Sequence, residues 1–254
     1  MRSSEIAVVG ICAALYAVIG LLTSFGLSVG GVAFYPAVVV PAIFAVLFGP
    51  WVGGIGAAIG IFIRDVIYHG DPVLSLVAGV TSNFTMFFLL GYLSHTRIDR
   101  KRIALSAIIG SILLISGLLL PTFLLPSESL LFTGLPTLDA IALFAVIATA
   151  SVIAGIAIFA FKKEWRTFSV GTVIGQSIGA IVVSITVWVY SNLFYSQNGY
   201  FKAPLPPAYI PLIFVWTIAT EIPFILILCP PIINASYKAF PSLKLFKKTK
   251  EKAK

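Results

Sequence analysis

Apolar runs of membrane-spanning length divide the chain, and they constrain its fold more than any other feature. Of the 254 residues, 59% are hydrophobic and only 10% are charged, against roughly 25% charged residues in a soluble domain. A helix needs roughly 20 apolar residues to cross the hydrocarbon core of a bilayer. The runs that meet or approach this length are 6–27, 32–48, 51–68, 73–93, 103–120, 138–161, 168–194 and 209–233. The sequence therefore predicts an all-α, polytopic helical bundle in the cell membrane.

The basic residues gather between these runs and predict the orientation of the chain. Four clusters hold every Lys and Arg except Arg64 and Lys202: Arg2, residues 94–102, residues 162–166 and the segment from Lys238 onward. Cytoplasmic loops carry an excess of such residues. If all four clusters lie in the cytoplasm, neighbouring clusters enclose four, two and two crossings. We therefore expect about eight spans, with both termini in the cytoplasm.

The chain is expected to form a single transmembrane domain over residues 1–237 and a basic cytoplasmic tail over 238–254. The lysines of the tail fit a solvated anchor on the anionic inner leaflet. This topology accounts for the formal net charge of +8, so membrane lipid is an expected partner and nucleic acid is not. The run 32–48 is short and contains Pro36 and Pro41, so we expect it to be tilted, kinked or partly re-entrant.

Polar side chains inside the apolar runs are the candidate contacts for a small-molecule substrate. Intramembrane charges are costly and usually face a cavity or a partner. Arg64 and Asp65 lie about 20 Å along the third run, toward its outer end. Glu221 lies near the middle of the last run, shortly after Trp216, and Asn83 lies mid-span in the fourth. The alternative is that these groups form internal ion pairs and hydrogen bonds that tie the spans together.

The end of the third run carries one further titratable group, His69. It is four residues after Asp65 and shares a helix face with it, and we expect it to be solvated near the membrane surface. One histidine with scattered carboxylates does not predict a metal site. The sequence also lacks GxxxxGK[ST], HExxH and CxxC motifs, and no catalytic residue, no cofactor and no ATP hydrolysis by this chain are predicted.

Aromatic residues mark the outer connections. Tyr35 precedes the second run, and Tyr195 begins an amide-rich connection before the last run. An interfacial aromatic belt accounts for such residues in many membrane proteins. The alternative is a lid whose rings stack on a planar ligand, which would make Tyr35 and Tyr195 substrate contacts.

Small residues repeat at helical spacing in the first run. Ala13 and Ala17 are four residues apart, and Gly10 and Ala14 form a second such pair. Residues at this spacing share a helix face, and small ones let another helix approach closely. The face they form either packs within the protein or docks a separate membrane subunit.

Three of these features together resemble the S components of energy-coupling factor (ECF) transporters. They are the Ala13/Ala17 face, the aromatic-proline loop Phe34-Tyr35-Pro36, and the block LFGPWVGGIGAAIGIFIRD from Leu47 to Asp65 with its Gly-Pro hinge. The resemblance covers about residues 6–93. S components usually have six spans, so the family pattern implies six where the basic clusters indicate eight.

The resemblance implies a function. S components are small membrane proteins that capture vitamins or related micronutrients from outside, and two ATP-binding cassette ATPases drive their cycle through a transmembrane coupling subunit. It implies docking to that subunit through Ala13 and Ala17, and it leaves Arg64 and Asp65 as candidates for the pocket rim. Gly10 and Ala14 are the further candidate docking residues of this helix. We therefore expect a substrate-binding membrane subunit for uptake of a vitamin-like small molecule, and not an enzyme.

Two other functions are compatible with the same residues. A self-contained proton-linked secondary transporter would use Glu221 as its proton-carrying group. An intramembrane lipid-modifying enzyme would use Glu221 and Asp65 as acid and base. A carrier would transport alone in response to a pH gradient, whereas an S component would bind its ligand alone but need partners for sustained uptake.

Overall fold

The structure is a computed structural model, and it describes residues 1–23, 28–96 and 165–243 together with isolated positions between 101 and 153. The predicted spans 103–120 and 138–161 lie outside the described residues, as does the tail beyond residue 243. The eight-span topology with cytoplasmic termini therefore stays a prediction.

Five described helical segments are long and apolar enough to cross a membrane. They are α1 (Ser3–Thr23), α3 (Pro50–His69), the continuous segment of α4 (Pro72–Leu74), η2 (Ser75–Val80) and α5 (Thr81–Ser94), then α8 (Arg166–Leu193) and α9 (Tyr209–Ala239). Each overlaps one of the predicted apolar runs. The prediction of an all-helical membrane bundle is confirmed. The last helix continues to Ala239, slightly beyond the predicted domain boundary at residue 237.

The run 32–48 departs from a straight span, as its prolines indicate. It begins inside a small antiparallel hairpin of β1 (Ser28–Val29) and β2 (Val32–Ala33). It then continues as a 3₁₀ turn, η1 (Pro36–Val38), and the short helix α2 (Val39–Phe48). The helical part from residue 36 to 48 is about 20 Å long at 1.5 Å per residue, less than the roughly 30 Å of a hydrocarbon core.

The turn of the hairpin requires glycine. Gly30 and Gly31 both have positive φ values, 56° and 87°, which is the backbone conformation of the tightest two-residue hairpin turns. Side chains with a Cβ rarely adopt this conformation. The pair therefore folds the outer loop back over the end of the bundle.

Helix η2 is a π-helical turn inside the segment between residues 72 and 94. Such wide turns leave carbonyl groups that need other donors and are frequent at functional sites. The Ser82 hydroxyl donates to the carbonyl of Ala78 at 2.6 Å, and the Asn83 side-chain amide donates to the carbonyl of Gly79 at 2.9 Å. Polar side chains of α5 therefore stabilise the wide turn.

Close helix contacts depend on glycines of α3 and α8. A Cβ added at Gly60 of α3 would lie 2.7 Å from the backbone oxygen of Ala13 in α1. A Cβ at Gly175 of α8 would lie 2.6 Å from the backbone oxygen of Met86 in α5. Both distances are too short for a carbon, so these helices approach as closely as backbone allows.

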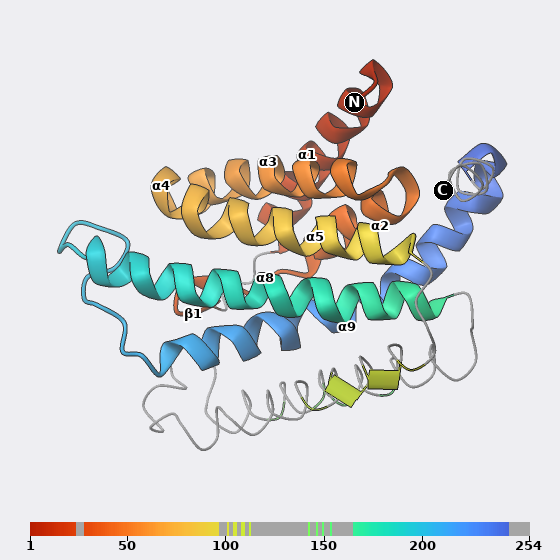
Figure 1. The fold of residues 1–254 in the computed structure, drawn as a ribbon. Helices are drawn as coiled ribbons and strands as arrows, with labels where there is room; N and C mark the ends of the chain where they lie inside the picture. Colours follow the sequence, from red (N-terminus) through yellow and green to blue (C-terminus); the bar gives the residue numbers. More distant parts are fainter. Residues whose placement is uncertain are drawn as a thin grey trace.

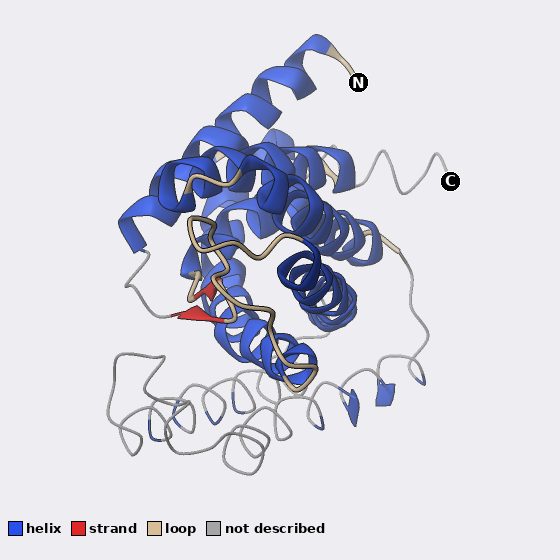
Figure 2. Cartoon of the chain, turned by 90° about the vertical axis from the view of Figure 1, so that its left-hand side faces the viewer, coloured by secondary structure: helices blue, strands red, loops and turns tan. Residues whose placement is uncertain are grey.

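Consecutive described long helices from α3 onward run in alternating directions between the two ends of the bundle. Helix α3 ends, α8 ends and α9 begins at the left-hand end of Figure 1, whereas α5 ends, α8 begins and α9 ends at the right-hand end. The basic clusters adjoin the right-hand end in sequence, which agrees with a cytoplasmic position for that end. Figure 2 looks onto the left-hand end and shows the hairpin and the connecting loops gathered there.

Two clusters of buried apolar side chains form the core. One includes Phe87 and Ile222 and fills the middle of the bundle. The other includes Val29, Val187 and Trp216 and lies beneath the outer loops. The second cluster therefore joins the hairpin to the outer ends of α8 and α9.

Candidate functional site

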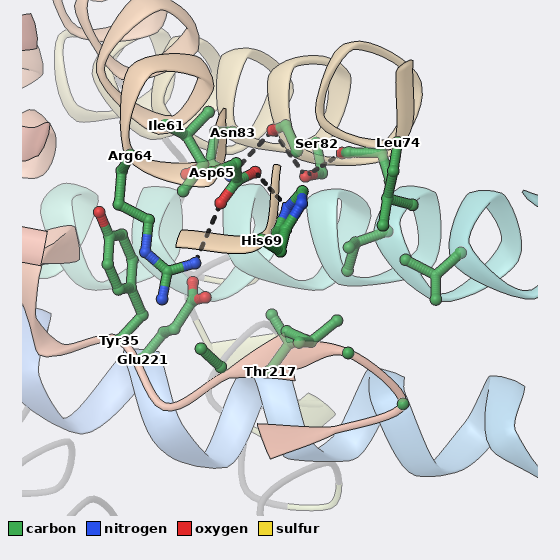
Figure 3. A pocket seen from close by; sticks show the side chains of 18 of the residues that line it. Tyr35, Ile61, Arg64, Asp65, His69, Leu74, Ser82, Asn83, Thr217 and Glu221 are labelled. Atoms are coloured by element: carbon green, nitrogen blue, oxygen red, sulfur yellow. Dashed lines mark hydrogen bonds and ion pairs between the residues drawn. The ribbon is translucent and has the colours of Figure 1, made fainter. Parts of the chain in front are cut away.

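A cavity opens at the end of the bundle where the outer loops gather. The space within it and at its mouth is about 620 Å³, part of which is open solvent. Its walls come from α3, η2, α5, α8 and α9, with the β1–β2 hairpin at one side. Figure 3 shows polar side chains converging in it from α3 and α9.

Five of the seven predicted substrate contacts line this cavity: Tyr35, Arg64, Asp65, Asn83 and Glu221. They come from four separate segments of the chain. Arg64, Asp65, Asn83 and Glu221 were identifiable because costly intramembrane groups are expected to face a cavity or a partner, and Tyr35 because an aromatic outer loop can stack on a ligand. Whether they contact a ligand stays a prediction.

The other two predicted contacts lie outside the cavity. Trp216 is buried, and its indole Nε1 donates a hydrogen bond of 2.9 Å to the backbone oxygen of Val32, so it holds the hairpin. Tyr195 is 53% exposed, in the connection after α8. Its exposed position fits the interfacial belt that the sequence also indicated.

Arg64 and Asp65 form a buried ion pair. The Nη1 atom of Arg64 lies 3.0 Å from Oδ1 of Asp65, and the two side chains are only 5% and 10% exposed. The guanidinium carbon of Arg64 lies 4.9 Å from the centre of the Tyr35 ring and 4.1 Å from that of Tyr68. These rings favour a nearby cation and limit the positions that the guanidinium can take.

The second oxygen of Asp65 is also engaged. It accepts a hydrogen bond of 2.9 Å from the Ser75 hydroxyl and lies 3.8 Å from Nε2 of His69. Nδ1 of His69 accepts from the backbone N–H of Asp71 at 3.2 Å. A neutral histidine with this acceptor carries its proton on Nε2, so its N–H is directed toward Asp65.

The burial of His69 corrects the expectation of a solvated residue. Its side chain is only 7% exposed, because the ring of Tyr200 covers it at 5.0 Å between ring centres. The sequence could not show this, because the loop that carries Tyr200 comes from between α8 and α9, far away in the chain.

Glu221 faces Arg64 from the opposite wall. Figure 3 shows its carboxyl group directed toward the guanidinium. Glu221 is 7% exposed, and its Oε2 atom has no hydrogen-bond partner among the described residues. A buried acceptor without a partner is costly, so this atom is placed to accept a hydrogen bond from a bound molecule.

The mouth of the cavity is framed by the outer loops. Gly30, Gly31 and Phe201 line it there, and the Tyr200 hydroxyl donates to the backbone oxygen of Gly31 at 3.4 Å. Burial raises the pKa of Tyr200 above its usual value, so its hydroxyl stays protonated and can donate. The two loops are thus joined across the mouth.

Several lining residues were not among the sequence predictions. Thr217 lies four residues before Glu221 on the same helix face, so helical spacing alone would have found it. The Gly30-Gly31 pair is a hairpin signal. Val183 and Phe201 also line the cavity, but a single apolar residue carries no signal that separates a cavity wall from a lipid-facing or core position.

The four predicted docking residues fall on two different faces of α1. Ala13 and Ala17 are only 3% and 4% exposed, because they pack inside this chain on the side that faces α3. Gly10 and Ala14 lie on the exposed side. A docking role for the first helix therefore fits the exposed Gly10 and Ala14 better than the buried Ala13 and Ala17, and docking itself stays a prediction.

Within the described part of the chain, no group of His, Cys, Asp and Glu side chains is arranged to hold a metal ion. The charged side chains that line the cavity are Arg64, Asp65 and Glu221. The site therefore offers hydrogen bonds and charge to a ligand, with apolar walls around them.

Comparison with known proteins identifies a family. The sequence model of the family described as ECF-type riboflavin transporter, S component, matches residues 1–162. No curated protein and no solved structure matches the chain. The matched region includes Tyr35, Arg64, Asp65 and Asn83, whereas Glu221 lies beyond it.

Proposed function

The chain belongs to the family of ECF-type riboflavin transporter S components, and from this premise we propose that it captures riboflavin, or a closely related vitamin, in the cavity between Arg64 and Glu221. Members of this family are substrate-binding transport subunits of the cell membrane and not enzymes. The multi-pass membrane character agrees with the five apolar helices. The proposal extends the family assignment to a particular ligand, its position and the partners of the chain.

The observation that carries the position of the ligand is the buried Oε2 atom of Glu221, which has no hydrogen-bond partner in the part of the chain that the structure describes. It faces a cavity that also presents the Arg64 guanidinium (Figure 3). A ligand with an N–H or O–H donor for Glu221 and an acceptor oxygen for Arg64 would contact both groups. The polar ring edge of riboflavin offers donors and acceptors of these kinds.

The walls of the cavity support a ligand with a flat apolar body. Ile61, Leu74, Val183 and Val187 line it together with Phe201 at the mouth. Ligand sites of this kind combine apolar walls with a few convergent polar groups that fix orientation. The lining of the cavity thus fits a molecule that has an apolar body and one polar edge.

Riboflavin binding by the purified chain tests the proposal. We expect saturable one-to-one binding in detergent solution, measured by the quenching of flavin fluorescence. Hydrogen bonds to charged groups contribute about 1.5–3 kcal/mol, so Arg64→Ala should weaken binding about 10- to 100-fold. Glu221→Gln keeps an acceptor but removes the charge, and we expect a loss near the lower end of that range.

Glu5→Gln is the matched control, because Glu5 lies in the first turn of α1, away from the cavity. It should bind riboflavin like the wild type. If Glu221→Gln and Arg64→Ala both left the affinity unchanged, the site assignment would be wrong. A wild-type protein that did not bind riboflavin at all would refute the choice of ligand.

The proposed partners are a transmembrane coupling subunit and two ATP-binding cassette ATPases. We propose that the exposed small residues Gly10 and Ala14 of α1 meet the coupling subunit. Gly10→Leu and Ala14→Leu should then reduce co-purification with the co-expressed partners and leave riboflavin affinity unchanged. Leu15→Phe adds bulk at an exposed position on a different side of α1, so it is the control and should co-purify normally.

The same preparations separate the proposal from a proton-linked carrier. Proteoliposomes that contain only this chain should not accumulate riboflavin under a pH gradient, whereas those that contain the full complex and ATP should. Accumulation by the chain alone would favour the carrier.

A further inference from the structure

We infer that Asp65 and Asn83 do not contact the ligand but act as positioning residues, which hold the Arg64 guanidinium in place through a closed ring of contacts. The inference rests on the proposed function, because it concerns how the same cavity binds its ligand. The ring runs through two chains of contacts, one on each side of Arg64. It includes two residues, Tyr16 and Ser75, that do not line the cavity.

The first chain of contacts begins at Asp65. One of its oxygens accepts from Arg64 at 3.0 Å, and the other accepts from Ser75 at 2.9 Å with the His69 N–H 3.8 Å away. Both oxygens are therefore occupied by groups of this chain. A ligand could bind Asp65 only by displacing one of these partners, so orienting Arg64 is the role that its contacts support.

The π-helical turn η2 packs against the Asp65 carboxylate and positions it. Ser75 lies at its start, and Gly79 faces the same carboxyl group: a Cβ added at Gly79 would lie 2.5 Å from Oδ2 of Asp65. A carbon cannot approach an oxygen so closely, so the absence of a side chain at Gly79 lets the carboxylate fit against the turn. Gly79 thus connects Asp65 to the second chain of contacts.

The second chain of contacts begins at the backbone of Gly79. Its carbonyl accepts from the Asn83 amide at 2.9 Å, and the Asn83 oxygen accepts from the Tyr16 hydroxyl at 2.6 Å. The carbonyl of Tyr16 accepts from the Tyr35 hydroxyl at 3.2 Å. Asn83 is therefore engaged at both ends of its amide, and its contacts support a structural role beside the cavity.

The ring closes at Arg64, whose guanidinium carbon lies 4.9 Å from the centre of the Tyr35 ring. The Tyr16 and Tyr35 rings also pack edge to face at 5.2 Å. Arg64 is thus held by a carboxylate on one side and by an aromatic ring on the other. A binding group whose position is fixed by its neighbours loses less conformational freedom when the ligand arrives.

A double-mutant cycle tests the inference. Ser75→Ala and Tyr16→Phe each remove one hydroxyl outside the cavity, and we expect each to weaken riboflavin binding about threefold to tenfold. In an Arg64→Ala background the same changes should have little further effect, because the residue they position is gone. A coupling of at least about threefold between each change and Arg64→Ala is the expected result.

Ser94→Ala is the matched control for Ser75→Ala. Ser94 is a buried serine whose hydroxyl donates to Leu90 within its own helix at 2.6 Å, and it does not line the cavity. It should leave the affinity unchanged. Thermal unfolding of each variant, measured in parallel, shows whether a weaker affinity accompanies a general loss of fold.

The outcomes separate the two proposals. If the wild type binds riboflavin and the effects of Ser75→Ala and Tyr16→Phe persist undiminished in the Arg64→Ala background, the positioning role is refuted and the proposed function stands. If the two single changes leave the affinity at the wild-type value, the positioning role is also refuted. If the wild type does not bind riboflavin, both proposals fail.

Discussion

Trp216 illustrates how a residue outside the cavity can control it. Its indole N–H donates to Val32 of the hairpin at 2.9 Å. Trp216→Phe removes this donor and keeps most of the ring volume. A neutral hydrogen bond contributes about 0.5–1.5 kcal/mol, so we expect riboflavin to dissociate about 2- to 10-fold faster from a less firmly held hairpin. Stopped-flow fluorescence measures this rate.

Tyr195→Phe is the control for that prediction. Tyr195 is exposed and does not line the cavity, so its hydroxyl should not influence dissociation. An unchanged rate in Trp216→Phe would show that the hairpin does not govern release. Faster dissociation of riboflavin from Tyr195→Phe would support the sequence prediction that Tyr195 contacts the ligand directly.

At the residue scale, the sequence predicted the charged part of the site better than its aromatic part. Arg64, Asp65 and Glu221 were identifiable because a charge inside an apolar run needs a cavity or a partner. The roles of Tyr195 and Trp216 could not be assigned in this way, because aromatic residues are common in a core, at the membrane interface and in ligand sites. Asn83 contacts the Tyr16 hydroxyl of α1 and the backbone oxygen of Gly79, and no local pattern shows the first of these contacts.

At the element scale, the close contact between α1 and α3 determines how tightly the N-terminal helices pack. Gly60→Ala would place a carbon 2.7 Å from the backbone oxygen of Ala13. A backbone atom cannot move aside by a rotamer change, so the two helices would have to shift apart. Overpacking of this kind costs about 1–3 kcal/mol. We expect Tm to fall by about 2–10 °C, measured by thermal unfolding in detergent.

Gly10→Ala is the control for Gly60→Ala, because a Cβ at Gly10 meets no atom within 4 Å. It should leave Tm unchanged or raise it slightly, since alanine is the better helix former. A Tm of Gly60→Ala equal to that of the wild type would mean that α1 and α3 can separate without cost.

The long helices were predictable, and the irregular elements between them were less so. Length and hydropathy determine a span of about 20 residues almost by themselves, and the ends of α3 and α8 fall close to the predicted limits. The π-turn η2 lies inside an apolar run with no break in its pattern. Its shape depends on donors from Ser82 and Asn83, which the sequence shows only as two polar residues in a helix.

At the scale of the whole molecule, the orientation in the membrane is the main prediction. Lys202 lies in the loop between α8 and α9, at the end opposite to Lys238 (Figure 1). We expect Lys202→Cys to react with an impermeant thiol reagent in intact cells, and Lys238→Cys to react only after permeabilisation. The native Cys12 and Cys229 are buried and serve as the unlabelled background. The reverse labelling pattern would invert the topology and the proposed entrance.

The packing beneath the cavity has a consequence for the cargo. Among the described helices, the space on the inner side of Glu221 is filled by tightly packed side chains such as Phe87, Ile222 and Ile225. The cavity is therefore open on its outer side and closed on its inner side. A bound vitamin has no direct path to the inner side, so its release there requires the whole helical bundle to reorient or open. Vesicles that contain this chain, with or without bound vitamin, should therefore remain impermeable to small solutes.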